Sequence, residues 1–177
     1  MGIDELVINT HHLSQKIDNF LKNKNYEISI TTTKEEKLLD TGGGILNATK
    51  KFEDNPFFVL NPDTIWNKNY YEELKVLENL YFANKKPVLL LIDKKKSHDK
   101  SFNGDFSFIN DKIITRQKEN NYIYTGAQII DRSIFSNMSE KFFSMNLIWD
   151  QLIQKQALLG YESNQTFFHV NSIEVFR

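Results

Sequence analysis

Three consecutive glycines, Gly42, Gly43 and Gly44, stand out in a chain that has seven glycines among its 177 residues. Glycine tolerates positive φ angles and lets a ligand approach bare backbone. A glycine run just before a helix also directs free N–H groups toward whatever lies there. The alternative is a flexible loop or tight turn, the commoner meaning of an isolated run. Its place between an expected strand and an expected helix favours a ligand-binding loop, because α/β proteins bind ligands beyond the carboxyl ends of their strands.

Asp63 follows an expected apolar strand over 56–60, in the sequence Asn61-Pro62-Asp63. A carboxylate at the end of a buried strand can hold hydrated Mg²⁺ beside a phosphate, since this ion takes one or two carboxylates together with substrate oxygens. The alternative is a turn or a helix N-cap, which Asp fills often. The residues alone leave both readings open.

Two further pairs and one histidine complete the candidates. Gly104-Asp105 enters an expected hairpin, and Thr125-Gly126 lies inside an expected strand, where a glycine suggests a bulge or a close backbone approach to a ligand. An ordinary turn and a packing glycine are the alternatives. His169 lies in an apolar terminal segment, where a histidine is more often hydrogen-bonded and half-buried than a ligand.

The elements that must position these residues alternate along the first half of the chain. Short apolar runs predict strands, and apolar residues at helical spacing predict helices between them. Expected strands cover 5–9, 26–32, 56–60 and 87–92, and expected helices cover 13–21, 45–52 and 70–82. The second half predicts a hairpin over 106–115, a strand over 122–130, a helix over 145–159 and a strand over 167–170. This order predicts an α/β fold with a largely parallel sheet, and without repeats we expect one domain over 1–177.

The composition excludes several classes of protein. Twenty-two basic and 23 acidic residues give a net charge of −1, so we expect no nucleic acid and no membrane as partner. The chain has no cysteine, which excludes disulfides and fits a reducing compartment. No apolar run approaches the roughly 20 residues that span a bilayer, and the first residues do not resemble a signal peptide. We therefore expect a cytoplasmic location.

Taken in order, these motifs resemble the sugar-1-phosphate nucleotidyltransferases. The resemblance rests on 39–45 (Leu-Asp-Thr-Gly-Gly-Gly-Ile), 61–63, 104–106 (Gly-Asp-Phe) and 125–126, and on 2–9, which resembles the second strand of that family. It is strongest to the branch of N-acetylmuramate-1-phosphate uridylyltransferase and mannose-1-phosphate guanylyltransferase-like proteins. It covers residues 2 to about 160, and the ordered set is more specific than any one motif.

The resemblance implies a Rossmann-like nucleotidyltransferase fold and the transfer of a nucleotidyl group from UTP or GTP to a sugar-1-phosphate, with release of pyrophosphate. It implies that Thr41 and Gly42–Gly44 lie against the base and ribose. It also implies that Asp63 binds Mg²⁺ and that Gly104, Asp105, Thr125 and Gly126 line the sugar pocket. Such reactions depend on positioning and charge neutralisation more than on covalent catalysis.

The sequence departs from the family in two places. The family begins with a strand, a glycine-rich loop carrying an arginine and a Pro-Lys-Pro element, and Met1 falls next to its second strand. We therefore expect an N-terminally truncated fold, a mispredicted start or a fragment, with the main basic catalytic residues in the missing segment. The alternatives are a non-catalytic nucleotide- or sugar-binding module and an interaction domain without a small ligand. The second departure is at 169–172 (His-Val-Asn-Ser), where the family has another metal-binding aspartate. There His169 is a possible ligand that suits Mg²⁺ poorly.

Overall fold

The computed structural model describes residues 2–52 and 55–170 of the chain. Its contacts divide the chain into two compact units, each described by itself. The first contains residues 1–55 and 132–148, and the second contains residues 56–131 and 149–177. The expectation of one domain over 1–177 stays a prediction. No helix of the described part is both long and apolar enough to cross a membrane.

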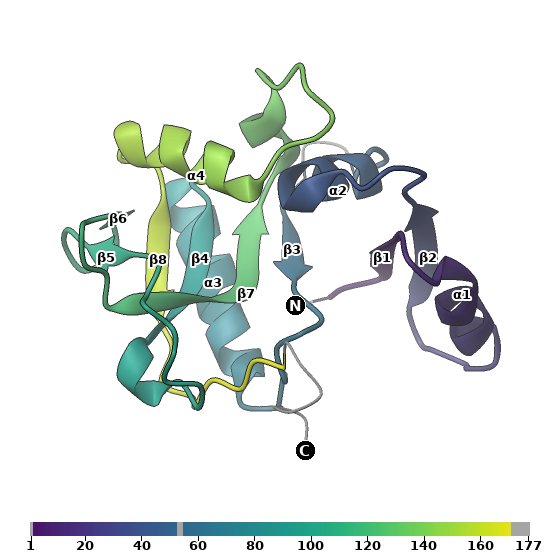
Figure 1. Ribbon diagram of the computed structural model, residues 1–177, viewed down its shortest axis with the longest axis horizontal. Coiled ribbons are helices and arrows are strands. Elements are labelled where there is room, and N and C mark those ends of the chain that lie inside the picture. The colour runs from purple at the N-terminus through teal and green to yellow at the C-terminus, as the bar shows by residue number, and fades with distance from the viewer. Residues whose placement is uncertain (1, 53–54, 171–177) are drawn as a thin grey trace. The chain divides into compact units, whose positions relative to one another are not determined.

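The first unit is built on a pair of parallel strands. β1 (Glu5–Thr10) pairs with β2 (Ser29–Lys34) along its whole length (Figure 1). Parallel neighbours need a crossover connection, and α1 (Ser14–Lys22) provides it. α2 (Asp40–Ala48) follows β2, and a later segment adds the 3₁₀ turn η2 (Arg132–Phe135) and the start of α4 (Met145–Gln154).

The second unit holds a four-stranded sheet in the order β3-β7-β4-β8. These strands are β3 (Phe57–Leu60), β7 (Tyr122–Ile130), β4 (Val88–Asp93) and β8 (Leu159–Glu162). β7 is antiparallel to β3 and β4, whereas β4 and β8 are parallel, so three of the four strands share one direction. α3 (Tyr70–Asn84), the 3₁₀ turn η1 (Lys94–Lys96) and the hairpin of β5 (Ser107–Phe108) and β6 (Ile114–Thr115) complete the unit. The predicted α/β fold and the predicted hairpin are confirmed.

The core of the second unit lies between the sheet and α3. β4 is the central apolar strand, and Val88 to Ile92 are fully buried, as expected for an uninterrupted apolar run. α3 lies beside β4 (Figure 1). Its residues Tyr70, Leu77 and Tyr81 belong to the same cluster as residues of β4 and β7. This rigid layer fixes the ends of the strands, where the candidate site residues lie.

Three expected elements differ from the structure. The helix expected over 45–52 begins at Asp40, so the glycine run lies inside it. The helix expected to reach 159 ends at Gln154, because the chain reverses at Gln156 (φ 51°) and residues 159–162 instead form β8 beside β4. The segment 167–170 forms isolated bridges instead of a continuous strand.

Candidate active site

The glycine run forms the first turns of α2. The helix starts at Asp40, whose φ of 62° is unusual for a residue other than glycine, and whose side chain accepts a 2.6 Å hydrogen bond from the N–H of Thr41. The N–H groups of Gly42 and Gly43 both donate to the carbonyl of Phe143, at 3.0 Å. The expectation of free N–H groups is therefore wrong for these two glycines, because a neighbouring segment of the same unit occupies them.

Close packing explains why these positions are glycines. A Cβ at Gly42 would overlap the ring of Phe143, and a Cβ at Gly43 would overlap the carbonyl of Lys141. The Thr41 hydroxyl accepts a 2.9 Å hydrogen bond from the N–H of Met145, which joins the helix start to the same segment. The glycine run thus has a structural role, and its nucleotide contact stays a prediction.

Glu35 holds the segment before α2 in place, and this role was not predicted from the sequence. It is 5% exposed and accepts hydrogen bonds from the side-chain amide of Asn9 at 3.0 Å and from the N–H of Leu39 at 3.1 Å. One signal was available, since Glu35 directly follows β2, as Asp63 follows β3 at a short distance.

In the second unit, the structure brings Asp63 and His169 together. The N–H of Val170 donates to the carbonyl of Asp63 at 2.7 Å, and the N–H of Ile65 donates to the carbonyl of Phe168 at 3.0 Å. This pairing places the His169 Nε2 atom 3.1 Å from the Asp63 Oδ2 atom. The Asp63 side chain is 42% exposed and that of His169 is 20% exposed. Residues 171 and 172 of the expected late motif lie outside the described residues.

Four buried polar atoms of this unit have no hydrogen-bond partner within the described chain. They are Asp63 Oδ1, Ser97 Oγ, Tyr124 Oη and His169 Nδ1. Burial raises the pKa of the Tyr124 hydroxyl above its ordinary value, and the charge of Asp63 raises it further, so the phenol is protonated at neutral pH. Most buried polar groups have partners, so each of these atoms marks a place where a water, an ion or a ligand can supply a contact.

Thr125-Gly126 forms the predicted irregularity in β7. The register with β4 shifts between Leu89 and Leu91, and Gly126 has a φ of 92°. A Cβ there would lie 2.7 Å from the Cβ of Asn61, so the β3 end closely approaches this glycine. The Thr125 hydroxyl is buried and donates to the carbonyl of Leu90 at 2.9 Å. This hydroxyl holds the strand, so any sugar contact at this position comes from backbone.

Gly104-Asp105 contacts the start of the same strand. Gly104 has a φ of 81°, and the N–H of Asp105 donates to the carbonyl of Tyr122 at 2.7 Å. An Asp105 carboxylate oxygen accepts a 2.9 Å hydrogen bond from the N–H of Tyr124. β7 thus connects Asp105 and Gly126 to the segment around Asp63, and all of them belong to the second unit. Thr41 and the glycine run belong to the other unit, and their place in a common site stays a prediction.

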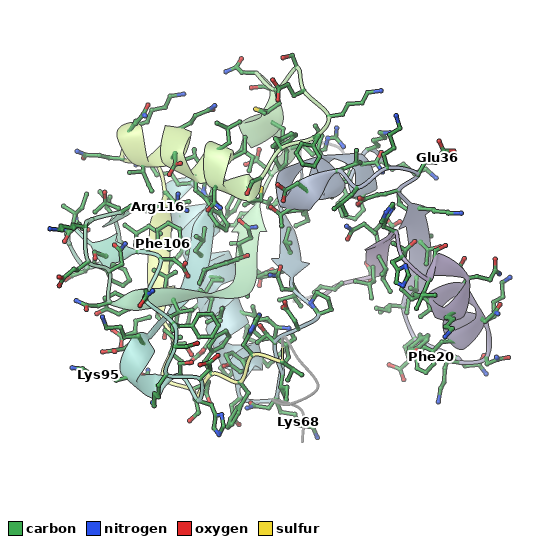
Figure 2. All side chains as sticks on the ribbon, viewed as in Figure 1. Phe20, Glu36, Lys68, Lys95, Phe106 and Arg116 are labelled. Carbon is green, nitrogen blue, oxygen red and sulfur yellow. The ribbon has the colours of Figure 1, made fainter. Side chains whose placement is uncertain are left out.

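An aromatic cluster beside Tyr124 was also missed from the sequence. The Trp149 ring lies edge-on to Tyr124 at 4.9 Å and to Phe106 at 5.7 Å. The Arg116 guanidinium lies 4.9 Å from the centre of the Phe106 ring, and Figure 2 shows the two side chains close together. Arg116 also forms a 2.5 Å ion pair with Asp150. The rings of Phe106 and Trp149 are buried, so the cluster packs beside β7, with the Arg116 charge held against the Phe106 ring.

The described residues contain no group of three or more His, Cys, Asp or Glu side chains arranged to hold a metal ion. Asp63 and His169 therefore offer two ligands, and a bound cation would draw its other ligands from water or substrate. That ligand number suits an ion that also contacts phosphate.

No model of a known protein family matches the chain. Its sequence is similar to D-glycero-α-D-manno-heptose 1-phosphate guanylyltransferase of Aneurinibacillus thermoaerophilus, with 24% identity over 184 residues, covering 99% of this chain and 76% of that protein. The resemblance predicted from the motifs is thereby confirmed.

Solved structures share the fold. HddC from Yersinia pseudotuberculosis matches with a TM-score of 0.75 at 18% identity, over 99% of this chain and 76% of that one. UDP-glucose pyrophosphorylase in complex with UDP-glucose matches with a TM-score of 0.75 at 12% identity, over 98% and 78%. The inositol-1-phosphate CTP transferase of T. maritima matches with a TM-score of 0.74 at 13% identity, over 99% and 74%. The predicted nucleotidyltransferase fold is confirmed.

Proposed function

We propose that this protein, a relative of the sugar-1-phosphate nucleotidyltransferases, joins a sugar-1-phosphate to a nucleoside triphosphate, giving an NDP-sugar and pyrophosphate. The observation that carries the proposal is the position of Asp63, just past the end of β3 and 3.1 Å from His169, in a fold shared with such enzymes. The relative's name supports GTP and a heptose phosphate as first substrates to test, with UTP as the other nucleotide. We also propose a cytoplasmic location, which a chain without cysteine fits.

Each group of residues has a proposed task. Thr41 and Gly42–Gly44 lie against the base and ribose, with Thr41 as the exposed residue of the run. The backbone of Gly104, Thr125 and Gly126, together with Asp105, lines the sugar pocket. Both glycines have positive φ angles, and the space of a Cβ is taken by Asn120 at Gly104 and by Asn61 at Gly126.

The cation would be held by Asp63 and His169, and their donor atoms fit one ion. When bound, the cation neutralises negative charge on the phosphates. Asp63 would hold it just past the end of β3, which β7 holds in place, and this would limit reorganisation during the reaction. The Tyr124 hydroxyl, neutral and without a partner within the described chain, can donate a hydrogen bond to a phosphate or sugar oxygen.

Pyrophosphate release tests the proposal. The protein as produced from its gene is incubated with GTP or UTP and a panel of hexose and heptose 1-phosphates. We expect release with at least one pair and its loss in Asp63→Asn, which keeps the shape and removes the charge. The control is Asp111→Asn, an exposed residue at the hairpin turn, with unchanged activity.

Calorimetry with GTP and UTP separates the alternatives. Heat of nucleotide binding without pyrophosphate release would indicate a non-catalytic binding module. No heat with any nucleotide and no effect of Asp63→Asn would overturn the nucleotide-dependent function.

A further inference from the structure

We infer that Asp63 and His169 form a site that prefers a first-row transition-metal dication, such as Mn²⁺, over Mg²⁺. The inference deepens the proposed function, because it rests on a cation at this position. It concerns the chemistry of the two ligands, and cation binding can be measured without any substrate.

The spacing of the donor atoms fits one shared ion. Nε2 of His169 and Oδ2 of Asp63 lie 3.1 Å apart. Two ligands at right angles on bonds of about 2.1 Å lie about 3.0 Å apart, so these atoms are at the spacing of neighbouring ligands around a single cation. The second carboxylate oxygen, Oδ1, is buried and unpaired, and offers a further donor from the same side chain.

The donor types decide the class of ion. Mg²⁺ is a hard cation that binds oxygen and keeps its water, so an imidazole nitrogen adds little to its affinity. Transition-metal dications accept imidazole nitrogen as well as carboxylate oxygen, and their affinity for such sites exceeds that of Mg²⁺. Mn²⁺ in addition takes carboxylate and water oxygen as readily as Mg²⁺ does, so it suits the mixed site beside a phosphate.

The imidazole is held in place before any ion arrives. The Phe102 ring lies edge-on to His169 at 5.4 Å, and the Phe167 ring stacks on it at 5.9 Å. The Thr64–His169 bridge fixes the backbone beneath the ring. A ligand restrained in this way loses little conformational freedom on binding.

The alternative reading is a plain hydrogen bond that fastens the terminal segment. Backbone bonds already do so, from Val170 to Asp63 and from Ile65 to Phe168. The two side chains also remain partly exposed, at 42% and 20%, so a cation can reach them. Asp99 also lies near enough to His169 for the two charges to interact, and its negative charge favours a cation there.

Mn²⁺ titration of the chelator-treated protein, followed by the electron paramagnetic resonance of free Mn²⁺, measures the preference. We expect one site that binds Mn²⁺ at least about tenfold more tightly than Mg²⁺, measured by competition. Asp63→Asn should remove binding of both ions. His169→Asp supplies a second carboxylate and should keep cation binding. The ratio of Mn²⁺ affinity to Mg²⁺ affinity should then fall to about threefold or less.

The matched control is His12→Asp, which makes the same change at an exposed residue of the first unit and should leave the ratio unchanged. Electron spin-echo modulation on the unmodified protein needs no variant, and should detect coupling of bound Mn²⁺ to an imidazole nitrogen. Equal affinity for the two ions, or bound Mn²⁺ without nitrogen coupling, would overturn the inference. A preference for Mn²⁺ without pyrophosphate release would support the inferred cation site and would count against the proposed function alone.

Discussion

The carboxylate of Glu73 on α3 accepts a 2.6 Å hydrogen bond from the hydroxyl of Ser163, and both residues are buried. The other carboxylate oxygen accepts a 2.8 Å bond from the N–H of Asn164 and a 3.3 Å bond from the side chain of Gln165. Glu73 thus fastens the segment after β8 to the helix. This segment continues to His169, so the contact helps to set the position of a candidate ligand.

Replacing Glu73 should therefore affect both stability and the site. Glu73→Ala leaves buried donors unpaired, and we expect a loss of roughly 3 kcal/mol in the free energy of unfolding, measured by urea denaturation. Mn²⁺ affinity should fall as well, because His169 is less firmly placed. Glu73→Gln keeps an acceptor and should lose about half as much stability.

Glu72, one residue earlier, is the control. Its side chain is 74% exposed and pairs with Lys75 on the surface. Glu72→Gln should change stability by less than about 0.5 kcal/mol. Similar losses of stability at the two positions would show that the buried hydrogen bonds of Glu73 do not stabilise the protein more than a surface ion pair does.

Gly126→Ala should destabilise the second unit. Its φ of 92° strains any residue with a Cβ, at about 1–2 kcal/mol. The added methyl would also press on Asn61, so thermal unfolding should show a total loss of more than 2 kcal/mol, roughly the sum of strain and overlap. Gly2→Ala, where a Cβ meets nothing within 4 Å, should be neutral. An unchanged melting temperature for Gly126→Ala would contradict the described bulge.

Tyr70 should make stability decline at alkaline pH. Burial, assisted by the charge of Glu73, raises the pKa of Tyr70 from its ordinary value of 10.0 to about 12. The folded state therefore holds the phenol proton more tightly than the unfolded chain. Its contribution is complete below pH 10 and is lost as the pH rises toward 12.

Denaturation series across this range measure the effect. Tyr70→Phe removes the titrating group, together with a 3.1 Å hydrogen bond to the carbonyl of Thr166. The variant should show a smaller decline with pH than the unmodified protein. Tyr81 and Tyr124, whose pKa values burial also raises, leave a residual slope. Identical slopes in the two proteins would contradict the raised pKa of Tyr70.

The elements predicted correctly from the sequence are those in which the local pattern of apolar residues also determines which side chains are buried. The apolar run of β4 indicates a buried strand, and the helical spacing over 70–82 indicates a helix with one buried face. The structure has both. The glycine inside the strand pattern suggested an irregularity at Gly126, with a packing glycine as the alternative, and the structure has a register shift there. Here local preference and tertiary packing agree, so the pattern is sufficient.

Other features depend on contacts between distant segments, which no local pattern encodes. β8 looks like the continuation of α4, and becomes a strand because it pairs with β4. Glu73 looks like a surface residue on an amphipathic helix, and is buried only because 163–165 covers it. The meeting of Asp63 with His169 follows from pairing between 63–65 and 168–170, so the sequence could name the two residues as candidates without placing them together.

Tyr124→Phe should separate a ligand contact from a structural one. The Tyr124 hydroxyl is buried without a hydrogen-bond partner in the described chain, so its removal relieves a desolvation cost. The ring contact with Trp149 survives the substitution. We expect equal or greater stability, by up to about 1 kcal/mol, together with weaker binding of substrate.

Thr125→Val provides the opposite result at the neighbouring residue. Its hydroxyl donates to the carbonyl of Leu90, so its loss should cost about 1–2 kcal/mol of stability. Once folded, this variant should bind substrate as before, because that hydroxyl is already occupied. Denaturation and calorimetry on both variants make the comparison. A Tyr124→Phe protein that is less stable yet binds substrate normally would remove Tyr124 from the site, since its hydroxyl would then serve the fold alone.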